Sequence, residues 1–491
     1  MAEIHTGATI SPTKLELVAP WMARQRWYAA KGRLPVLRRL WSWRLDDPAG
    51  EVGVETLLLV DEGGPEPVVY QVPITYRGAP LEGAQHALVG TMEHSVLGRR
   101  WVYDGPHDPV YASQLLALTL GQAVPQAGGM SDTPEPAVAG VRHASWTADL
   151  HVRGSRVLSG EQSNTSVILD CATAEGAPNP LICKVFRMLH PGENPDVTVQ
   201  GALFEGGCRR VPAMVGSVTA HWPDPFWQPD ASPGGNTGGE APRAYGHLAF
   251  AQEFLPGTED AWRVALRSVA AGDDFTGPAR ELGAATAEVH EVLRTVLPTE
   301  PATEEAIAAT IASMRSRYVA AASEVPALAA HEHQVAAVYD RAVNTKWPVL
   351  QRIHGDYHLG QVLRVPDRGW VLLDFEGEPL RPLAERALPD QPLRDVAGML
   401  RSFDYAAGSR EQSHPGASAR EWAADAQRAF LDGYAAQSGR DPRADSALLT
   451  AFQLDKALYE VVYEARNRPT WLTIPTAAVA RLLDDARRDP S

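Results

Sequence analysis

Residues 352–365, RIHGDYHLGQVLRV, place a carboxylate and an amide side chain at a spacing that suits phosphoryl transfer. Asp356 is followed after four residues by Gln361, and the strand-like run GWVLLDFEGEP then brings Asp374 and Glu376. Such a reaction needs one carboxylate to accept the proton of the acceptor hydroxyl, and oxygen ligands for a metal that neutralises the donor phosphates. We therefore predict Asp356 as the base and Gln361 and Asp374 as Mg²⁺ ligands.

Glu376 lies two residues beyond Asp374 and is predicted either to bind the metal as well or to shape the acceptor pocket. The protein-kinase catalytic loop has the same spacing with Asn in place of Gln, and Gln keeps the amide oxygen that a metal uses. The alternative is a hairpin whose acidic residues only cap turns. Loop, spacing and strand occur together and in order, which favours the catalytic interpretation.

His354 and His358 flank the predicted base at a spacing of four residues. A pair of histidines at this spacing binds metal when both lie on one face of a helix. This segment contains glycines and has no helical period, so we expect the two side chains to brace the loop through hydrogen bonds.

Lys184 is the next candidate, in the short apolar strand PLICKVFRML. Only five of the 45 basic residues of the chain are lysines, so a lysine kept in such a strand is notable. A buried ammonium needs an anionic partner, and in the kinase arrangement that partner is the pair of α- and β-phosphates of the nucleotide. The alternative is a lysine that reaches solvent from a strand edge.

Two further segments have features that suit nucleotide binding. SGEQSNTSVI, residues 159–168, lies between predicted strands and offers Ser163, Asn164 and Thr165 as donors to phosphate. It has one glycine rather than a glycine-rich loop, so alone it is a weak signal. QEFLPGT, residues 252–258, resembles a hinge whose backbone at Glu253 to Leu255 is predicted to bind an adenine edge.

Apolar periodicity divides the chain into a β-rich half and an α-rich half. Two β segments joined by a Gly-Gly turn are predicted at 51–76, a loop at 124–140, and paired strands from 150 onward. A helix near 196–208 and strands at 214–222 and 248–255 follow, with an exposed excursion at 223–246. Alanine-rich helices dominate 260–345 and 420–488. This order predicts an α+β protein with two lobes and a cleft.

Composition excludes several classes of function. The net charge of −15 argues against a surface that neutralises nucleic-acid phosphates. No run approaches the length of a membrane span, and the N-terminus lacks the pattern of a secretory signal, so a cytoplasmic location is expected. Cys171, Cys183 and Cys208 show no metal or disulfide spacing and are predicted core residues. WMARQRWYAAKGR, residues 21–33, is expected to pack an N-terminal subdomain onto the lobe beneath it or to meet a partner enzyme.

An acceptor site is predicted on the helix 450–467 near the C-terminus. Tyr463 lies on one stripe of this helix, and Glu460 and Glu464 lie on the adjacent stripe. Beyond the helix, RNRPTWLTIP presents Arg466 and Trp471. We predict Glu460 and Trp471 as contacts of a sugar, with Tyr463, Glu464 and Arg466 as weaker candidates; the alternative is a solvated Lys–Glu stripe.

These motifs together resemble the actinobacterial maltokinases, a family within the aminoglycoside-phosphotransferase-like superfamily. The resemblance rests on GEQSNTSVI, CKVFR, HGDYHLGQVLR, LLDFEGEP, PLRDVAGMLRSFDYAA and LDKALYEVVYEARNRPTWLTIP, and it covers most of the chain. It implies a bilobal protein-kinase-like fold with a β-rich N-lobe, an α-rich C-lobe and an extra N-terminal cap subdomain. The expected boundaries are 1–105 for the cap, 106–256 for the N-lobe and 257–491 for the C-lobe.

The resemblance also implies a reaction and a partner. ATP with Mg²⁺ would phosphorylate maltose at its anomeric hydroxyl, and the maltose 1-phosphate would feed α-glucan and glycogen synthesis. Trehalose synthase is the implied partner. One departure concerns the helix glutamate that pairs with the phosphate lysine: this chain reads NPDVTVQGALFEGG, with Thr198 at the expected position and Asp196 or Glu205 as possible substitutes.

Other acceptors and another class of function remain open. The same catalytic loop would serve glucosamine, glucose or an aminoglycoside, and a glucosamine pocket would need only one well-placed carboxylate, such as Glu460. A catalytically dead pseudokinase that serves as a scaffold for trehalose synthase is the alternative of another class, supported only by the missing helix glutamate.

Overall fold

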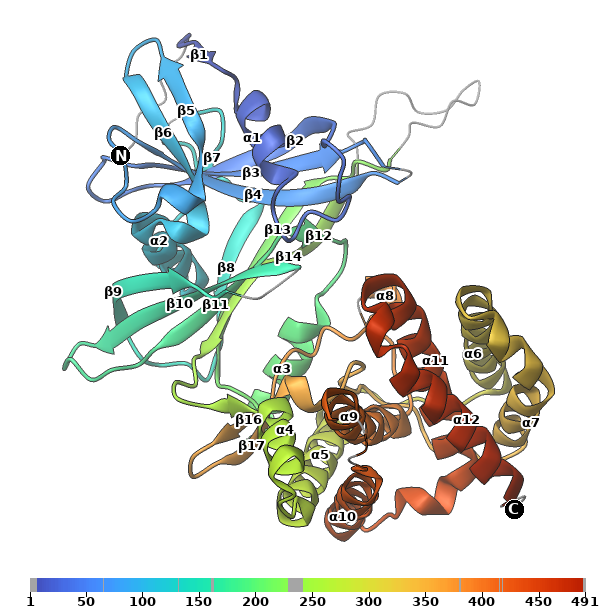
Figure 1. The fold of residues 1–491 in the computed structure, drawn as a ribbon. Helices are drawn as coiled ribbons and strands as arrows, with labels where there is room; N and C mark the ends of the chain where they lie inside the picture. Colours follow the sequence, from blue (N-terminus) through green and yellow to red (C-terminus); the bar gives the residue numbers. More distant parts are fainter. Residues whose placement is uncertain are drawn as a thin grey trace. The chain divides into compact units, whose positions relative to one another are not determined.

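The computed structural model describes residues 7–64, 66–130, 132–159, 163–227, 242–378, 381–414, 416 and 418–488. Its contacts divide the chain into two compact units, which are described separately: residues 1–197 with 213–256, and residues 198–212 with 257–491 (Figure 1). Most of the predicted excursion at 223–246 and residues 160–162 of the predicted phosphate loop lie outside the described residues. The three-part division at 105/106 and 256/257 stays a prediction.

The first unit begins with an antiparallel sheet that is covered by a short helix. Within the described residues its strand order is β1 (Ile10–Ser11), β5 (Leu88–His94), β6 (Gly98–Asp104), β4 (Val68–Arg77), β3 (Gly53–Asp61), β2 (Leu37–Leu45) and β7 (Gln126–Ala127), and β12 (Met188–Leu189) pairs with β4. β3 and β4 confirm the two β segments expected around the Gly-Gly turn. Helix α1 (Lys14–Met22) starts with a capping box in which Thr13 and Glu16 bond each other's backbone.

The aromatic residues of segment 21–33 are part of the core of this unit. Trp21, Trp27 and Tyr28 are buried in one apolar cluster with strand residues of β3 and β4. The Tyr28 hydroxyl donates to Asp61 at 2.8 Å, which satisfies the polar end of a buried ring. These aromatic side chains lie in the core of the N-terminal sheet itself. The two roles expected for the segment, packing of the subdomain onto the lobe beneath it and contact with a partner, stay predictions.

A second antiparallel sheet completes the first unit. Its order among the described residues is β8 (Val138–Arg142), β13 (Met214–Pro223), β14 (Arg243–Glu253), β11 (Leu181–Phe186), β10 (Asn164–Thr173) and β9 (Leu150–Val157), and helix α2 (Pro109–Thr119) precedes it along the chain. β10, β11, β13 and β14 confirm strands predicted from the sequence. The three cysteines are buried, as expected, and burial raises the pKa of the Cys171 thiol to about 12 and that of Cys208 to about 11.

Two buried polar side chains tie the two sheets together. Gln71 on β4 donates to the backbone oxygens of Phe186 and Leu248 at 2.9 and 2.8 Å. Arg187 is fully buried and donates through Nη2 to both oxygens of Asp104, each at 2.8 Å. Its guanidinium also lies 4.8 Å from the centre of the Trp27 ring. A buried arginine is stable only with such partners, so these contacts hold the two sheets of the first unit against each other.

The second unit is mainly helical, as the alanine-rich half of the sequence predicted. It holds a small sheet of β15 (Glu259–Asp260), β16 (Val362–Val365) and β17 (Gly369–Leu372). The helices are α4 (Ala261–Ala271), α5 (Thr276–Val296), α6 (Glu304–Glu324), α7 (Glu332–Val343), α8 (Leu383–Arg386), α9 (Pro392–Ser413), α10 (Arg420–Ser438), α11 (Ser446–Asn467) and α12 (Thr473–Arg488). Helix α3 (Pro195–Glu205) starts in the first unit, and its part from residue 198 onward belongs to the second.

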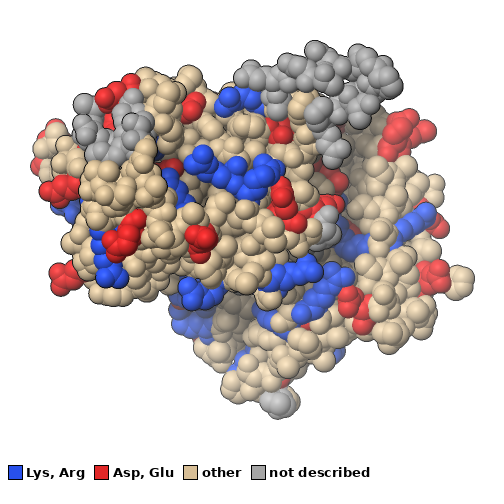
Figure 2. Space-filling model, turned by 90° about the horizontal axis from the view of Figure 1, so that it is seen from above, with Lys and Arg blue, Asp and Glu red and all other residues tan. Residues whose placement is uncertain are grey.

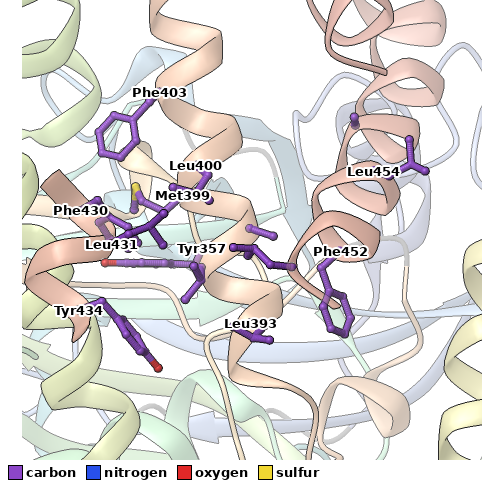
Figure 3. Packing of buried hydrophobic residues seen from close by; sticks show 14 of the residues in the cluster. Tyr357, Leu393, Met399, Leu400, Phe403, Phe430, Leu431, Tyr434, Phe452 and Leu454 are labelled. Atoms are coloured by element: carbon purple, nitrogen blue, oxygen red, sulfur yellow. The ribbon is translucent and has the colours of Figure 1, made fainter. Parts of the chain in front are cut away.

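The core of the second unit anchors the segment that carries the predicted base. The ring of Tyr357 lies among side chains of α9 and α10, including Leu400 and Leu431 (Figure 3). Its hydroxyl forms a hydrogen bond of 2.8 Å with the Thr286 hydroxyl on α5. Because Tyr357 is the neighbour of Asp356, apolar burial of the tyrosine holds the aspartate at the edge of the core.

Helices α5 and α10 pack closely enough that their backbones almost touch. An added Cβ would lie 1.9 Å from the Phe430 oxygen at Gly283 and 2.0 Å from the Arg280 oxygen at Gly433. No side chain fits at either position without moving a helix. These two glycines therefore set the distance between the helices that flank the Tyr357 pocket.

Charged groups of both signs are interspersed over the face drawn in Figure 2, and much of that face is uncharged. Among the helices of the described ranges, none has the length and apolar character that crossing a membrane requires.

Gly283→Ala is expected to lower the free energy of unfolding by about 1–3 kcal/mol, because its methyl group would overlap a backbone oxygen of α10. Urea denaturation of the purified protein measures this change. Gly277→Ala on the same helix is the matched control, because an added Cβ meets no atom within 4 Å there. Equal stability of both variants would contradict the close approach of α5 and α10.

Candidate active site

The backbone of the predicted catalytic loop is held by Asp395, in the first turn of α9. Its carboxylate accepts the N–H of His354 at 2.8 Å and of Gly355 at 2.9 Å, and His290 contacts it at 3.0 Å. Burial alone would raise the pKa of Asp395, but the bond from His290 and the neighbouring positive groups and N–H donors lower it. A buried, ionised carboxylate therefore binds the backbone of the loop and holds it in place.

Gly355 lets the loop pass close to the next strand connection. Its φ is +84°, and a Cβ there would lie 3.2 Å from the Cα of Gly377. The loop therefore meets the segment that follows β17, which carries Asp374 and Glu376.

The two histidines of the loop brace it, as predicted. His354 Nε2 lies 2.8 Å from the backbone oxygen of Leu373, and its Nδ1 accepts the N–H of Asp356 at 3.4 Å. His358 Nδ1 accepts the N–H of Gly360 at 3.0 Å and caps a 3₁₀ turn, Leu359–Gln361. Both rings serve the geometry of the loop.

The second unit brings Gln361 and Asp374 into contact. Gln361 Nε2 donates to Asp374 Oδ2 at 2.9 Å, so the amide and the carboxylate are oriented together. Asp374 has a φ of +63°, a backbone conformation that residues other than glycine rarely adopt and that recurs at functional sites. Carboxylate and amide oxygens are ligands that Mg²⁺ accepts. The donor set at Gln361, Asp374 and Glu376 thus fits a magnesium ion, which when bound would neutralise donor phosphates.

Asp356 forms an ion pair with Lys456, a residue that was not predicted to belong to the site. Lys456 on α11 donates to Asp356 Oδ1 at 2.9 Å and to Glu378 Oε1 at 3.0 Å. Its ammonium also lies 4.7 Å from the centre of the Tyr459 ring. Burial alone would lower the pKa of Lys456, but the carboxylates of Asp356 and Glu378 outweigh it and raise the pKa above its usual value.

The pair Asp356–Lys456 is the end of a series of charges that alternate in sign. Glu378 Oε2 accepts from Arg317 on α6 at 3.3 Å, and Arg317 Nε lies 2.9 Å from Asp455 Oδ1, an ion pair without hydrogen-bond geometry. Asp455 Oδ2 in turn accepts from Arg394 on α9 at 3.2 Å. The series, here called the ion-pair chain, comprises Asp356, Lys456, Glu378, Arg317, Asp455, Arg394, Asp390 and Arg381.

Lys456, Glu378 and Arg317 were missed because their partners lie far away in the sequence. A signal for one of them was present: Lys456 is among only five lysines, the same scarcity that drew attention to Lys184. Nothing in the sequence marked Glu378 or Arg317, since a single arginine on an alanine-rich helix is usual on a solvated face.

The predicted acceptor carboxylates on α11 differ in how far they are engaged. Glu464 is 1% exposed; Arg468 donates to both of its oxygens, and Tyr405 also donates to one of them. Glu460 receives the buried Arg401 only at Oε2, at 3.1 and 2.7 Å, and no described residue donates to its Oε1. Burial raises the pKa of Glu460 in spite of Arg401. Both oxygens of Glu464 thus accept hydrogen bonds from the protein, whereas only Oε2 of Glu460 does so among the described residues.

The remaining acceptor candidates lie at the end of α11 and beyond it. Tyr463 is 38% exposed, and the Arg468 guanidinium lies 5.5 Å from its ring and 4.9 Å from that of Trp471. Arg466 is exposed and donates to Glu324 at 2.7 Å. The structure thus groups Tyr463 and Trp471 around Arg468 and directs Arg466 toward α6.

In the first unit, Lys184 forms an ion pair with Asp196. Lys184 Nζ lies 2.7 Å from Asp196 Oδ2, and Asp196 is in the first turn of α3. Of the two substitutes that the sequence offered for the missing helix glutamate, Asp196 pairs with the lysine. The ammonium of Lys184 thus has the anionic partner that a lysine in an apolar strand needs.

The other predicted nucleotide contacts are already partly engaged. Thr165 Oγ1 accepts from the buried Arg187 at 2.8 Å, and Asn164 Nδ2 lies 3.3 Å from Ser163 Oγ. In the predicted hinge, the Glu253 N–H donates to Ala213, and the next N–H donates to Pro180. The N–H groups of Glu253 and Phe254 are thus used within the protein, and the adenine contact predicted at Glu253 to Leu255 stays a prediction.

Comparison with known proteins identifies the family. Residues 21–108 match the maltokinase N-terminal cap domain, and residues 230–448 match the phosphotransferase enzyme family. A glucosamine kinase of Streptacidiphilus jiangxiensis is 30% identical over 367 residues, which are 70% of this chain and 77% of that protein. The chain belongs to the aminoglycoside-phosphotransferase-like family of kinases.

Further relatives of this kinase agree. A glucosamine kinase of Mycolicibacterium smegmatis is 28% identical over 78% of this chain and 90% of its own length. A solved glucosamine kinase in complex with glucosamine, ADP and inorganic phosphate has a TM-score of 0.61 at 25% identity, with 96% of this chain and 99% of that chain covered. The predicted fold class, α+β and kinase-like with an N-terminal cap, is confirmed. Kinases of this family use ATP, and Mg²⁺ is typical of them.

Glu378 makes the stability of this kinase depend on pH. Burial would raise its pKa, but Lys456, Arg317 and Arg394 lower it to about 2. Because the folded pKa lies below the unfolded one, this contribution is present above about pH 4.5 and is lost as the pH falls toward 2. Between pH 7 and 3.5 the free energy of unfolding should therefore fall by about 1 kcal/mol more in the wild type than in Glu378→Gln, which lacks this carboxylate. Urea denaturation at both pH values tests this, and an equal decline of the two proteins would contradict it.

Proposed function

We propose that this kinase transfers the γ-phosphoryl group of ATP to a hydroxyl of glucosamine, with Asp356 as the base. The observation that carries the proposal is the Asp356 carboxylate: Lys456 holds Oδ1, and no described residue donates to Oδ2. An acceptor hydroxyl needs such an oxygen within hydrogen-bond reach. The choice of sugar is supported by relatives named glucosamine kinase over most of the chain.

In the proposed step, the acceptor hydroxyl gives its proton to Asp356 Oδ2 while its oxygen bonds to the γ-phosphorus. The bond between that phosphorus and the β,γ-bridging oxygen breaks, and ADP leaves with the electron pair. Gln361 and Asp374 would hold Mg²⁺, and Lys184, held by Asp196, would bind the donor phosphates. Such transfer depends mainly on positioning and charge neutralisation, which these residue types supply.

Glu460 is the proposed contact of the amino group of the acceptor. Its Oε1 has no described donor, and it is one helical turn from Lys456, which binds the base. An ammonium group gains most from a carboxylate that is partly withdrawn from solvent. Trp471 and Tyr463 are proposed as apolar surfaces for the sugar ring, with Glu376 at the pocket wall; Glu464 and Arg466 are assigned lower weight because both have protein partners.

Maltose is the second candidate acceptor. It is favoured by the match of residues 21–108 to the maltokinase cap domain and by the maltokinase-like sequence LDKALYEVVYEARNRPTWLTIP. Phosphorylation would then occur at the anomeric hydroxyl to give maltose 1-phosphate for α-glucan and glycogen synthesis, and trehalose synthase would be the partner. A cytoplasmic location, where ATP is available, belongs to either version of the proposal.

The scaffold alternative has lost the observation that favoured it. It rested on the absence of a glutamate partner for Lys184, and Asp196 pairs with that lysine at 2.7 Å. The proposed base, metal ligands and phosphate lysine are all present in the chain.

³¹P NMR of the protein with Mg-ATP and, in separate tubes, glucosamine, maltose, glucose and kanamycin should give a new phosphomonoester signal with glucosamine. Asp356→Asn should reduce that transfer by about 10²-fold or more, because it removes the proton acceptor, while nucleotide binding persists. A product from maltose alone would replace the acceptor and keep the base. Wild-type turnover by Asp356→Asn would exclude the assigned base.

Glu460→Gln should raise the KM for glucosamine by about tenfold or more, because it removes a charge-assisted hydrogen bond to the amino group. Its kcat with saturating glucosamine should change less, and the preference for glucosamine over glucose should fall. Steady-state assays of ADP release measure these constants. Glu421→Gln, an exposed glutamate on α10, is the control, and a KM equal to that of the control would rule Glu460 out.

A further inference from the structure

Lys456 lies where the acceptor helix meets the catalytic loop. It is on α11, one hundred positions from Asp356 in the sequence, and the side chains of Lys456 and Asp356 are 15% and 19% exposed. Its ammonium is bound on three sides, by Asp356, by Glu378 and by the face of Tyr459. A group enclosed in this way has one orientation.

The contact leaves the two oxygens of Asp356 unequal. Oδ1 accepts the Lys456 ammonium at 2.9 Å, and no described residue donates to Oδ2. A carboxylate bound through one oxygen cannot rotate freely about its Cβ–Cγ bond without losing a charge-assisted hydrogen bond. The lone pairs of Oδ2 therefore keep a fixed direction.

Neutralising Glu378 does not by itself explain a lysine at this position. Glu378 Oε2 already accepts from Arg317, and Glu378 is held in the ion-pair chain whether or not Lys456 is present. An ammonium is a compact charge that reaches two carboxylates at once. What Lys456 adds is a hydrogen bond that links the ion-pair chain to the Asp356 carboxylate.

We propose that Lys456 is a positioning residue for phosphoryl transfer: it fixes Asp356 through Oδ1 so that Oδ2 faces the acceptor hydroxyl. The inference rests on the proposed function, in which Asp356 is the base. Through Glu378 and Arg317, the ion-pair chain extends this positioning to α6 and α9, so the orientation of the base depends on helices outside the catalytic loop.

Lys456→Met keeps most of the side-chain volume and removes the charge. It should lower kcat by about 10²-fold, in the range found for loss of a positioned general base, with the dissociation constant for ATP unchanged within about twofold. Lys456→Arg should recover part of kcat, because it restores a cation with a different shape. Lys346→Met, at an exposed lysine before the catalytic loop, is the matched control and should keep wild-type kcat.

A double variant separates positioning from charge balance. Lys456→Met removes one cation from Glu378, and the unbalanced negative charge should lower the thermal stability. Adding Glu378→Gln removes that negative charge. Lys456→Met with Glu378→Gln should regain thermal stability relative to the single lysine variant, and kcat should stay low because nothing holds Asp356 Oδ1.

Recovery of both stability and kcat in the double variant would overturn the proposal, since Lys456 would then serve charge balance alone. Wild-type kcat in Lys456→Met would overturn it as well. Asp356→Asn is assayed in parallel: if it retains turnover, the assigned base fails and the inference fails with it. If Asp356→Asn is inactive and Lys456→Met is not, only the role of Lys456 is wrong.

Discussion

The ion pair between Asp356 and Lys456 is the contact on which the candidate site depends. Asp356, Asp374, Glu376 and Glu378 follow one another around a single loop and strand, and carboxylates placed together repel unless cations lie between them. A proton acceptor must be ionised and must point in one direction. Lys456 supplies the direction, because its hydrogen bond selects one oxygen of the Asp356 carboxylate.

The helical unit is arranged to hold that pair in place. Taking two charges from water costs several kcal/mol, and a buried pair is stable only where further partners satisfy it. The ion-pair chain does this by alternating acids and bases from α11, α6 and α9. Asp395 holds the loop backbone, and the buried ring of Tyr357 holds the residue beside the base. Removing any one partner would leave an uncompensated charge or a free loop, so chemistry and stability share the same residues.

The sequence identified what is local and missed what is tertiary. The spacing of Asp356, Gln361 and Asp374 led to predicted roles for these residues, and the structure brings Gln361 and Asp374 into contact. Strand and helix patterns placed both halves of the chain, because period and spacing are properties of neighbouring residues. The partner of Lys184 could be narrowed to two acids but not chosen, since the start of α3 decides which one faces the strand. The pairing of Lys456 with a residue one hundred positions away has no local signature in the sequence. No feature of the sequence indicated that the Glu464 carboxylate accepts hydrogen bonds from Arg468.

A crystal structure of the protein with glucosamine and a non-hydrolysable ATP analogue would test the central claim most directly. The account predicts a sugar hydroxyl at about 2.6–3.2 Å from Asp356 Oδ2, with Lys456 still bound to Oδ1. A sugar bound away from Asp356, or a Lys456 ammonium that has left the aspartate to contact the sugar instead, would contradict it.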